Sequence, residues 1–141
     1  MIILGADHAG FELKNKIKEY LKSNNEVLDV GASVLDENDD FSSFVLLMRE
    51  HFNKHLDARI IAICGSGVGM NIGLNKYKGI RCVIGHSVDE VKLARAHNDV
   101  NALSLSGKTQ INDAISMINA FLSTPFLSGK YEKRMNEIEI K

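Results

Sequence analysis

The chain has 141 residues, a formal net charge of −1 and a hydrophobic content of 45%. These values are typical of one globular domain over residues 1–141, and they give no electrostatic reason to expect nucleic acid or a membrane as a partner. Two cysteines are too few for a disulfide framework and suit a reducing compartment. No apolar run approaches the roughly 20 residues of a membrane span, and the chain opens directly on an apolar strand, so we expect a cytoplasmic protein.

Short apolar runs alternate with segments of helical periodicity along the whole chain. Strands are predicted at 1–6, 26–30, 59–63, 80–84 and 101–105. Helices are predicted around 13–21, at 42–55, from 71, at 87–97, at 111–122 and at 128–141, the fourth with Ser87 and Glu90 as a capping box. The residues expected to face inward from the first, second and fourth helices are Leu13, Ile17, Tyr20 and Leu21; Phe44, Val45, Leu47, Met48 and Phe52; and Val88, Val91, Leu93 and Ala94. This alternation predicts an α/β fold whose parallel sheet is covered on both faces, with a ligand site at the carboxyl ends of its strands.

A glycine-rich turn, Cys64-Gly65-Ser66-Gly67-Val68-Gly69-Met70, follows the third predicted strand. Its glycines permit a tight turn that aims successive N–H groups at one point, which suits a phosphate or a developing oxyanion. Positive potential there would stabilise a thiolate on Cys64. Met70 stands where a dinucleotide fingerprint needs glycine and where a cysteine phosphatase loop needs arginine, and no Gly-Lys-Ser/Thr closes the turn as in a Walker loop. The alternative to a functional site is that Cys64 is a small buried side chain and that the glycine turn serves packing only.

Asp7 and His8 follow the first predicted strand, so they can share one crevice with Cys64. A thiolate there can attack a carbon with histidine as its base, or it can take a proton from a carbon next to a carbonyl while the N–H groups hold the enolate oxygen. The second chemistry fits the three glycines better, and Asp7 and His97 would then serve oxygen-bound protons. His51 and His55 lack an evident third metal ligand, so a solvated helix face is expected for them.

Four motifs in order along nearly the whole chain resemble one known family. They are Gly5-Ala6-Asp7-His8-Ala9-Gly10-Phe11, the Cys64–Met70 turn, Asn75-Lys76 with Gly79-Ile80-Arg81, and Arg95-x-His97-Asn98-Asp99-x-Asn101. In residue types and spacing they are similar to the type B ribose-5-phosphate isomerases, a family that also contains the galactose-6-phosphate isomerase subunits. The resemblance implies a Rossmann-like three-layer α/β/α fold with a five-stranded parallel sheet, in the order 2-1-3-5-4.

The resemblance also implies an activity and a set of partners. The reaction is the interconversion of D-ribose 5-phosphate and D-ribulose 5-phosphate through a cis-enediolate, in the pentose phosphate pathway, with no metal and no cofactor. The protein would be a homodimer or homotetramer whose active site is shared across the dimer interface, with the C-terminal helix from about 128 packed on the partner.

Site residues carry over from the resemblance position by position. The implied catalytic residues are Asp7, Cys64, Ser66 and His97, and the implied substrate-binding residues are His8, Gly65, Ser66, Gly67, Val68, Gly69, Asn98, Lys108, Lys130 and Arg134. Cys64 would move the proton between C2 and C1, and His97 with Asp7 would open the furanose ring. The turn amides, supported by Asn98, would hold the enediolate oxygen, and the cations with His8 would hold the phosphate.

Two departures from the family pattern concern specificity. Lysine occupies positions 108 and 130, where arginine is usual, which keeps the charge and loses the two-pronged geometry. The usual Tyr-Pro segment is Phe41-Ser42-Ser43-Phe44. An isomerase of a six-carbon sugar phosphate (allose or galactose 6-phosphate) and a non-catalytic sugar-phosphate sensor are the alternative functions.

Overall fold

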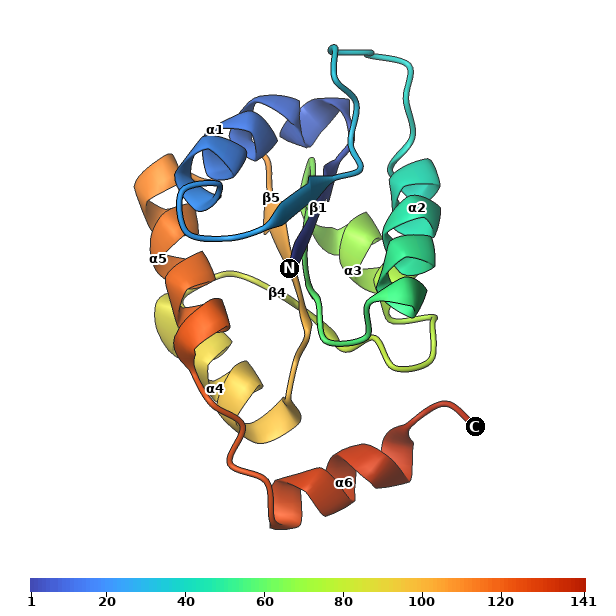
Figure 1. Cartoon of the computed structure of the whole chain (residues 1–141), viewed down its shortest axis with the longest axis vertical. Coiled ribbons are helices and arrows are strands. Elements are labelled where there is room, and N and C mark those ends of the chain that lie inside the picture. Colours follow the sequence, from blue (N-terminus) through green and yellow to red (C-terminus); the bar gives the residue numbers. More distant parts are fainter.

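A computed structural model describes residues 1–141 and contains one parallel sheet in the order β2-β1-β3-β5-β4 (Figure 1). The strands are β1 (Ile2–Ala6), β2 (Val27–Asp29), β3 (Arg59–Cys64), β4 (Cys82–Ile84) and β5 (Ala102–Ser106). The helices are α1 (Phe11–Leu21), α2 (Phe41–Lys54), α3 (Val68–Leu74), α4 (Val88–Asn98), α5 (Ile111–Ser123) and α6 (Lys130–Ile138), with a 3-10 turn, η1 (His8–Gly10), after β1. The predicted α/β fold and strand order are confirmed.

Helices cover both faces of the sheet: α1, α4 and α5 lie on one face, and α2 and α3 on the other (Figure 1). Side chains of β3 alternate between the two apolar clusters that result. Ile61 and Ile63 join the α1/α4/α5 cluster, whereas Ile60, Ala62 and Cys64 join the α2/α3 cluster. The helices leave β1 and β3 toward opposite faces, so the chain diverges between their carboxyl ends and opens the crevice expected of such folds.

Three residues predicted to face inward are exposed instead. Tyr20, Leu47 and Leu93 keep 41%, 39% and 55% of their surface accessible. Tyr20 and Leu47 lie beside the buried stripe of their helices, whereas Leu93 lies on the face of α4 opposite the buried Val91 and Arg95. The Tyr20 hydroxyl donates a hydrogen bond to Asn119 Oδ1 of α5 at 3.0 Å. This contact connects α1 to α5 at the edge of the buried stripe. Another difference is the start of α3 at Val68, inside the glycine turn, because Gly67 adopts a φ of +81° and acts as its N-cap.

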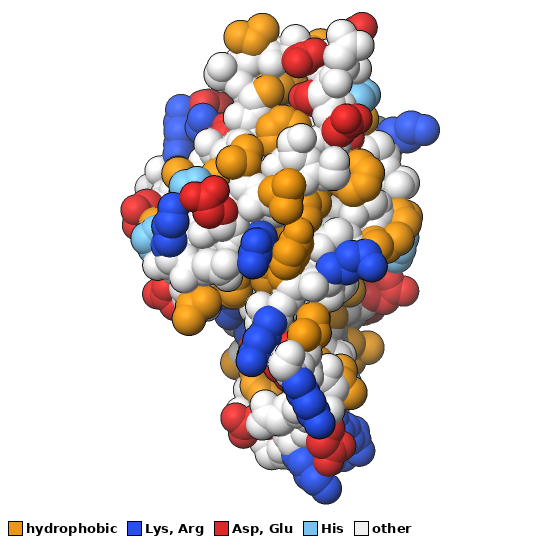
Figure 2. All heavy atoms as spheres, turned by 90° about the vertical axis from the view of Figure 1, so that its right-hand side faces the viewer, with side chains coloured by type: hydrophobic (Ala, Val, Ile, Leu, Met, Phe, Trp, Pro, Cys, Tyr) orange, Lys and Arg blue, Asp and Glu red, His pale blue; other side chains and the backbone are white.

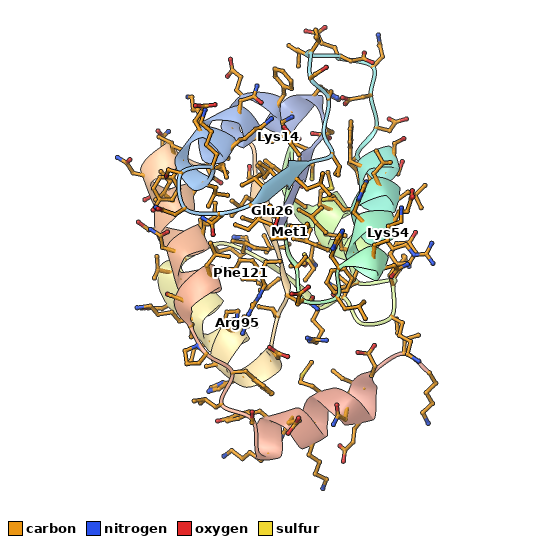
Figure 3. All side chains as sticks on the ribbon, viewed as in Figure 1. Met1, Lys14, Glu26, Lys54, Arg95 and Phe121 are labelled. Carbon is orange, nitrogen blue, oxygen red and sulfur yellow. The ribbon has the colours of Figure 1, made fainter.

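A buried lysine fixes the end of β2. Lys14 of α1 is 1% exposed, and its Nζ donates to both carboxylate oxygens of Asp29 at 3.0 and 3.1 Å and to the Ala32 carbonyl at 2.8 Å. Figure 3 shows its side chain among those between α1 and the sheet. The apolar periodicity of residues 13–21 predicts that the lysines of this helix lie on the opposite, solvent side, and for Lys14 this prediction is wrong.

Helix α6 lies apart from the sheet (Figure 1) and forms the extension that carries several cationic side chains in Figure 2. None of its residues is buried. Its contacts are with the end of α4, where the Tyr131 ring stacks on His97, and with the segment before β4, where Glu139 accepts from the Gly79 N–H at 3.1 Å. No helix of the chain combines the length and the apolar character needed to cross a bilayer.

Candidate active site at the carboxyl edge of the sheet

Asp7 and Cys64 lie side by side where β1 and β3 end. The register pairs Ala6 with Ile63, so the next residues along the two strands, Asp7 and Cys64, are neighbours at a strand spacing of about 4.8 Å. Side-chain alternation places both on the α2/α3 face. Asp7 is 8% exposed, and its Oδ1 accepts the Ala9 N–H at 3.0 Å and the Gly10 N–H at 3.3 Å, which fixes the carboxylate at the start of η1.

The backbone of the Cys64 turn presents unpaired donors. The N–H groups of the turn that find no acceptor within the chain are those of Gly65, Ser66, Gly67, Gly69 and Met70. The turn itself is held rigidly: Gly107 donates to the Cys64 carbonyl at 2.8 Å, and Ser106 Oγ donates to the Gly65 carbonyl at 2.7 Å. Because the Cys64 and Gly65 carbonyls are already hydrogen-bonded and these amides are not, the turn presents a cluster of N–H donors that suits an anionic oxygen.

Cys64 is at the floor of this turn. It is 5% exposed and belongs to the α2/α3 apolar cluster, with Met70 as another member. The α2/α3 cluster thus covers most of the Cys64 side chain. The other cysteine, Cys82, is at the start of β4, and burial raises its pKa to about 12, so it is a thiol at neutral pH.

His8 is held by Asp39, a residue of the loop before α2. Asp39 Oδ1 accepts from the His8 backbone N–H at 2.8 Å and lies 2.9 Å from Nδ1 of its ring. The hydrogen bond that the His8 ring makes to Asp39 is the largest influence on the pKa of His8. It raises this pKa above its usual value, against desolvation, and Asp7 adds to the rise. Residues 32–40 form a polar, acidic segment after the second predicted strand, which predicts a loop at the border of the site, but the sequence does not single out Asp39.

The loop after β5, which carries Lys108, packs against η1, which begins at His8. Gly107 lies so close to η1 that a Cβ there would be 2.1 Å from the Ala9 carbonyl oxygen, so the exposed Lys108 follows directly beside the turn that carries His8. Lys108 and Ser66 also line an open cleft of about 660 Å³ between the ends of β3, β5 and β4. The cleft continues past His86 and Ser87 to the first turn of α5.

Phe41 borders the site on another side. The sequence alone does not predict where this residue lies. A Cβ on Gly69 would lie 2.9 Å from the Phe41 ring, so the first residue of α2 packs directly on the backbone of the glycine turn. The ring is 38% exposed. An apolar edge thus borders the free amides where the family pattern has tyrosine.

The remaining predicted site residues lie at the opposite edge of the sheet. His97 and Asn98 end α4, and the next residue, Asp99, binds Arg81 just before β4 and Arg95 on α4. Figure 3 shows the buried Arg95 side chain directed from α4 into the body of the domain. Since β5 starts at this edge and ends beside Cys64, one strand length, roughly 13 Å, separates the two places.

Lys130 and Arg134 share that second location. Both are exposed on α6, with their cationic groups 5.3 and 5.7 Å from the centre of the Tyr131 ring. The same ring stacks on His97, with centroids 4.4 Å apart and planes inclined by 6°, a contact that the sequence did not predict. Asn98 faces α6 as well, since its Nδ2 lies 3.5 Å from Met135 Sδ, and it lines a cavity of about 380 Å³ between β4 and α6.

The predicted residues therefore form two groups. The carboxyl-edge group is Asp7, His8, the Cys64–Gly69 turn and Lys108, and the amino-edge group is His97, Asn98, Lys130 and Arg134. One chain brings together the members of each group but does not bring the groups to one another. No cluster of three or more His, Cys, Asp or Glu side chains suited to a metal ion occurs in the chain.

Comparisons with known proteins identify relatives along the whole chain. Residues 2–138 match the family described as Ribose/Galactose Isomerase. Ribose-5-phosphate isomerase B of Mycobacterium tuberculosis is 34% identical over 139 residues, which cover 97% of this chain and 86% of that protein. The structure of ribose-5-phosphate isomerase B from Mycoplasma genitalium with bound ribulose-5-phosphate superposes with a TM-score of 0.92 at 34% identity, covering 97% of this chain and 92% of that one. The Thermotoga maritima ribose 5-phosphate isomerase structure has a TM-score of 0.92 at 36% identity, covering 98% and 96%.

Proposed function

The chain belongs to the Ribose/Galactose Isomerase family and is an isomerase, and from this premise we propose that it interconverts D-ribose 5-phosphate and D-ribulose 5-phosphate. Relatives that carry this activity in their names align over 97% of the chain. A relative with the same fold holds ribulose-5-phosphate. These findings support a pentose phosphate as the substrate.

The observation that carries the proposed mechanism is the set of free amides beside Asp7 and Cys64. An aldose–ketose isomerisation moves one proton between C2 and C1 and develops negative charge on the sugar oxygens. In the proposed step the Cys64 thiolate takes the C2 proton of the open-chain aldose, so that the C2–H electron pair enters the enediolate. The resulting thiol returns the proton to C1, while the hydroxyl proton of O2 passes to O1. The amides of Gly65–Gly69, with Ser66, stabilise the enediolate oxygen.

We assign ring opening and part of the phosphate site to the amino-edge group of a second subunit. His97 and Asn98 cannot reach Cys64 within one chain, so the proposal places them in the pocket of a partner in a homodimer. The α2/α3 side supports such an association because Leu46, Val68 and Ile72 of these helices are exposed, and Figure 2 shows hydrophobic side chains gathered on this side of the molecule. In this arrangement His97, with Asp7, transfers the protons that open the furanose ring.

The phosphate is held in the proposal by His8 and Lys108 from one subunit and by Lys130 and Arg134 from the other. A lysine ammonium acts as a point charge, whereas an arginine binds two phosphate oxygens in one plane. Arg134 is therefore the residue expected to orient the phosphate, and the lysines add attraction with less geometric selectivity.

The test is a panel of pentose and hexose phosphates with purified protein in deuterated solvent. The proposal expects turnover of ribose 5-phosphate with deuterium incorporated at the carbon that exchanges its proton. Turnover confined to allose or galactose 6-phosphate would assign the six-carbon alternative. Binding without deuterium incorporation would identify a sugar-phosphate sensor.

A further inference from the structure

The contact between Asp39 and His8 joins two loops that are 31 residues apart in sequence. Asp39 Oδ1 accepts the His8 backbone N–H at 2.8 Å and approaches Nδ1 at 2.9 Å, and the Asp39 carbonyl oxygen lies 3.2 Å from the same Nδ1. Both oxygens are acceptors only, since neither a carboxylate nor a carbonyl carries a proton to donate. Nδ1 of His8 must therefore carry a hydrogen.

The second oxygen of this carboxylate favours a positive charge on the His8 ring. Asp39 Oδ2 is the one buried side-chain polar atom of the chain that has no hydrogen-bond partner, and the side chain keeps 13% of its surface exposed. A carboxylate oxygen removed from water without a partner is costly unless a positive charge lies close by. The His8 imidazolium is the charge within contact distance, so Asp39 favours the doubly protonated ring.

The consequence for phosphate binding follows from the tautomer. A neutral His8 keeps its single proton on Nδ1 to satisfy Asp39, which leaves Nε2 with a lone pair that repels a phosphate oxygen. Only the imidazolium presents an N–H at Nε2. We propose that Asp39 is a positioning residue that fixes the Nδ1 side of His8 and thereby makes phosphate capture depend on the imidazolium.

This inference rests on the proposed function, in which His8 contacts the phosphate. The charged groups that raise the pKa of His8 are Asp39, across the loop, and Asp7, its neighbour in the chain. Lys108 is the cation on the loop after β5, which packs against η1. The contribution of the His8 imidazolium to phosphate affinity is complete well below the pKa of His8, and it is lost as the pH rises through that pKa. If His8 alone set the affinity, the KM for the sugar phosphate would rise on the order of tenfold per pH unit above the His8 pKa, because the competent fraction falls by that factor. The lysines make the observed rise shallower.

The experiment compares full-length wild type with Asp39→Asn from neutral to alkaline pH at constant ionic strength. The asparagine retains an oxygen that can accept from Nδ1, and it removes the charge. We expect the rise in KM for ribose 5-phosphate to begin at a lower pH in Asp39→Asn, with a smaller change in kcat. Asp36→Asn is the matched control because Asp36 is in the same loop and its carboxylate accepts only from the Asn38 N–H, not from His8. Its backbone carbonyl accepts the Asp39 N–H, and the substitution keeps that carbonyl, so the profile of Asp36→Asn should coincide with that of wild type. Asp39→Glu, which keeps the charge, should restore part of the difference.

A spectroscopic readout separates this inference from the activity. Nitrogen–proton correlation spectra of the His8 ring, assigned with His8→Gln, should show the neutral wild-type ring protonated on Nδ1, and inorganic phosphate should bind more weakly as that ring deprotonates. A neutral ring protonated on Nε2, or identical KM profiles for wild type and Asp39→Asn, would overturn the proposal. Absence of turnover in wild type with the expected tautomer and phosphate response would instead reject the proposed function alone.

Discussion

Replacing Cys64 with alanine tests the proposed base directly. A positioned acid or base contributes on the order of 10²–10⁴-fold to a proton transfer, so Cys64→Ala should lower kcat by about that factor. The free amides of the turn and His8 remain in this variant. Affinity for inorganic phosphate should therefore change little.

The structure allows the effect on stability to be separated from the effect on rate. Cys64 is 5% exposed within the α2/α3 cluster, so loss of its sulfur removes a contact comparable with one buried methylene, about 1 kcal/mol. Domains of this size have a free energy of unfolding of about 5–15 kcal/mol. A loss of about 1 kcal/mol leaves nearly all molecules folded, and it cannot account for a hundredfold fall in kcat.

The assay measures kcat, deuterium incorporation from solvent and thermal unfolding with and without phosphate. Cys82→Ala is the matched control, because it removes the only other sulfhydryl from β4, an edge strand that pairs with β5 and not with β3. Its thiol, with a pKa of about 12, should also resist alkylation at mildly alkaline pH. A Cys64→Ala variant that keeps kcat and deuterium exchange within a few-fold of wild type would refute the assignment of the base, and equal losses in both variants would attribute the effect to packing.

Two further predictions concern the framework of the site. Burial alone would raise the pKa of Asp29, but hydrogen bonds from Lys14, the Gly31 N–H and Lys18 lower it. The ion pair of Asp29 therefore stabilises the fold fully at pH values above the pKa of aspartate in the unfolded chain, about 3.9. This stabilisation is lost as the pH falls through the lower pKa of Asp29 in the folded protein. Lys14→Met should reduce the free energy of unfolding in urea by about 2–4 kcal/mol at neutral pH and by less in acid; an equal loss at both pH values would contradict this. Gly67→Ala should cost about 1–2 kcal/mol for its φ of +81° and also lower kcat, because its Cβ would lie 3.2 Å from the Leu105 backbone carbon and displace the turn. Gly79→Ala, at the same φ with open space around its Cβ, should show the stability loss without the fall in kcat, and equal kcat in the two variants would disprove the link to the turn.

Much of the fold could be predicted from the sequence because each strand and helix has a local signature. The apolar run at 59–63 and the glycine turn behind it identify a central strand with a site at its end, and Asp7 follows β1 at the same edge. The start of α3 was misplaced because the decisive feature is the positive φ of Gly67, which hydrophobic periodicity does not encode.

The side-chain contacts that refine the site could not be predicted, because they are long-range. Lys14 has the helical position of a solvent-facing residue, and only the return of β2 brings Asp29 to it. In the same way the acidic loop contains several carboxylates, and nothing local distinguishes Asp39 from its neighbours before the loop is seen against η1. The stacking of Tyr131 on His97 depends on how α6 folds back on α4.

The separation of Cys64 and His97 by a full strand has a genetic consequence. If each pocket combines the thiol of one subunit with the imidazole of another, a variant lacking the thiol and a variant lacking the imidazole are each inactive in isolation but are defective in different halves of the pocket. Mixed dimers of the two would contain one pocket with both defects and one with neither. Co-expression of the two mutant genes should therefore restore activity that neither possesses, approaching one quarter of the wild-type level if subunits pair at random.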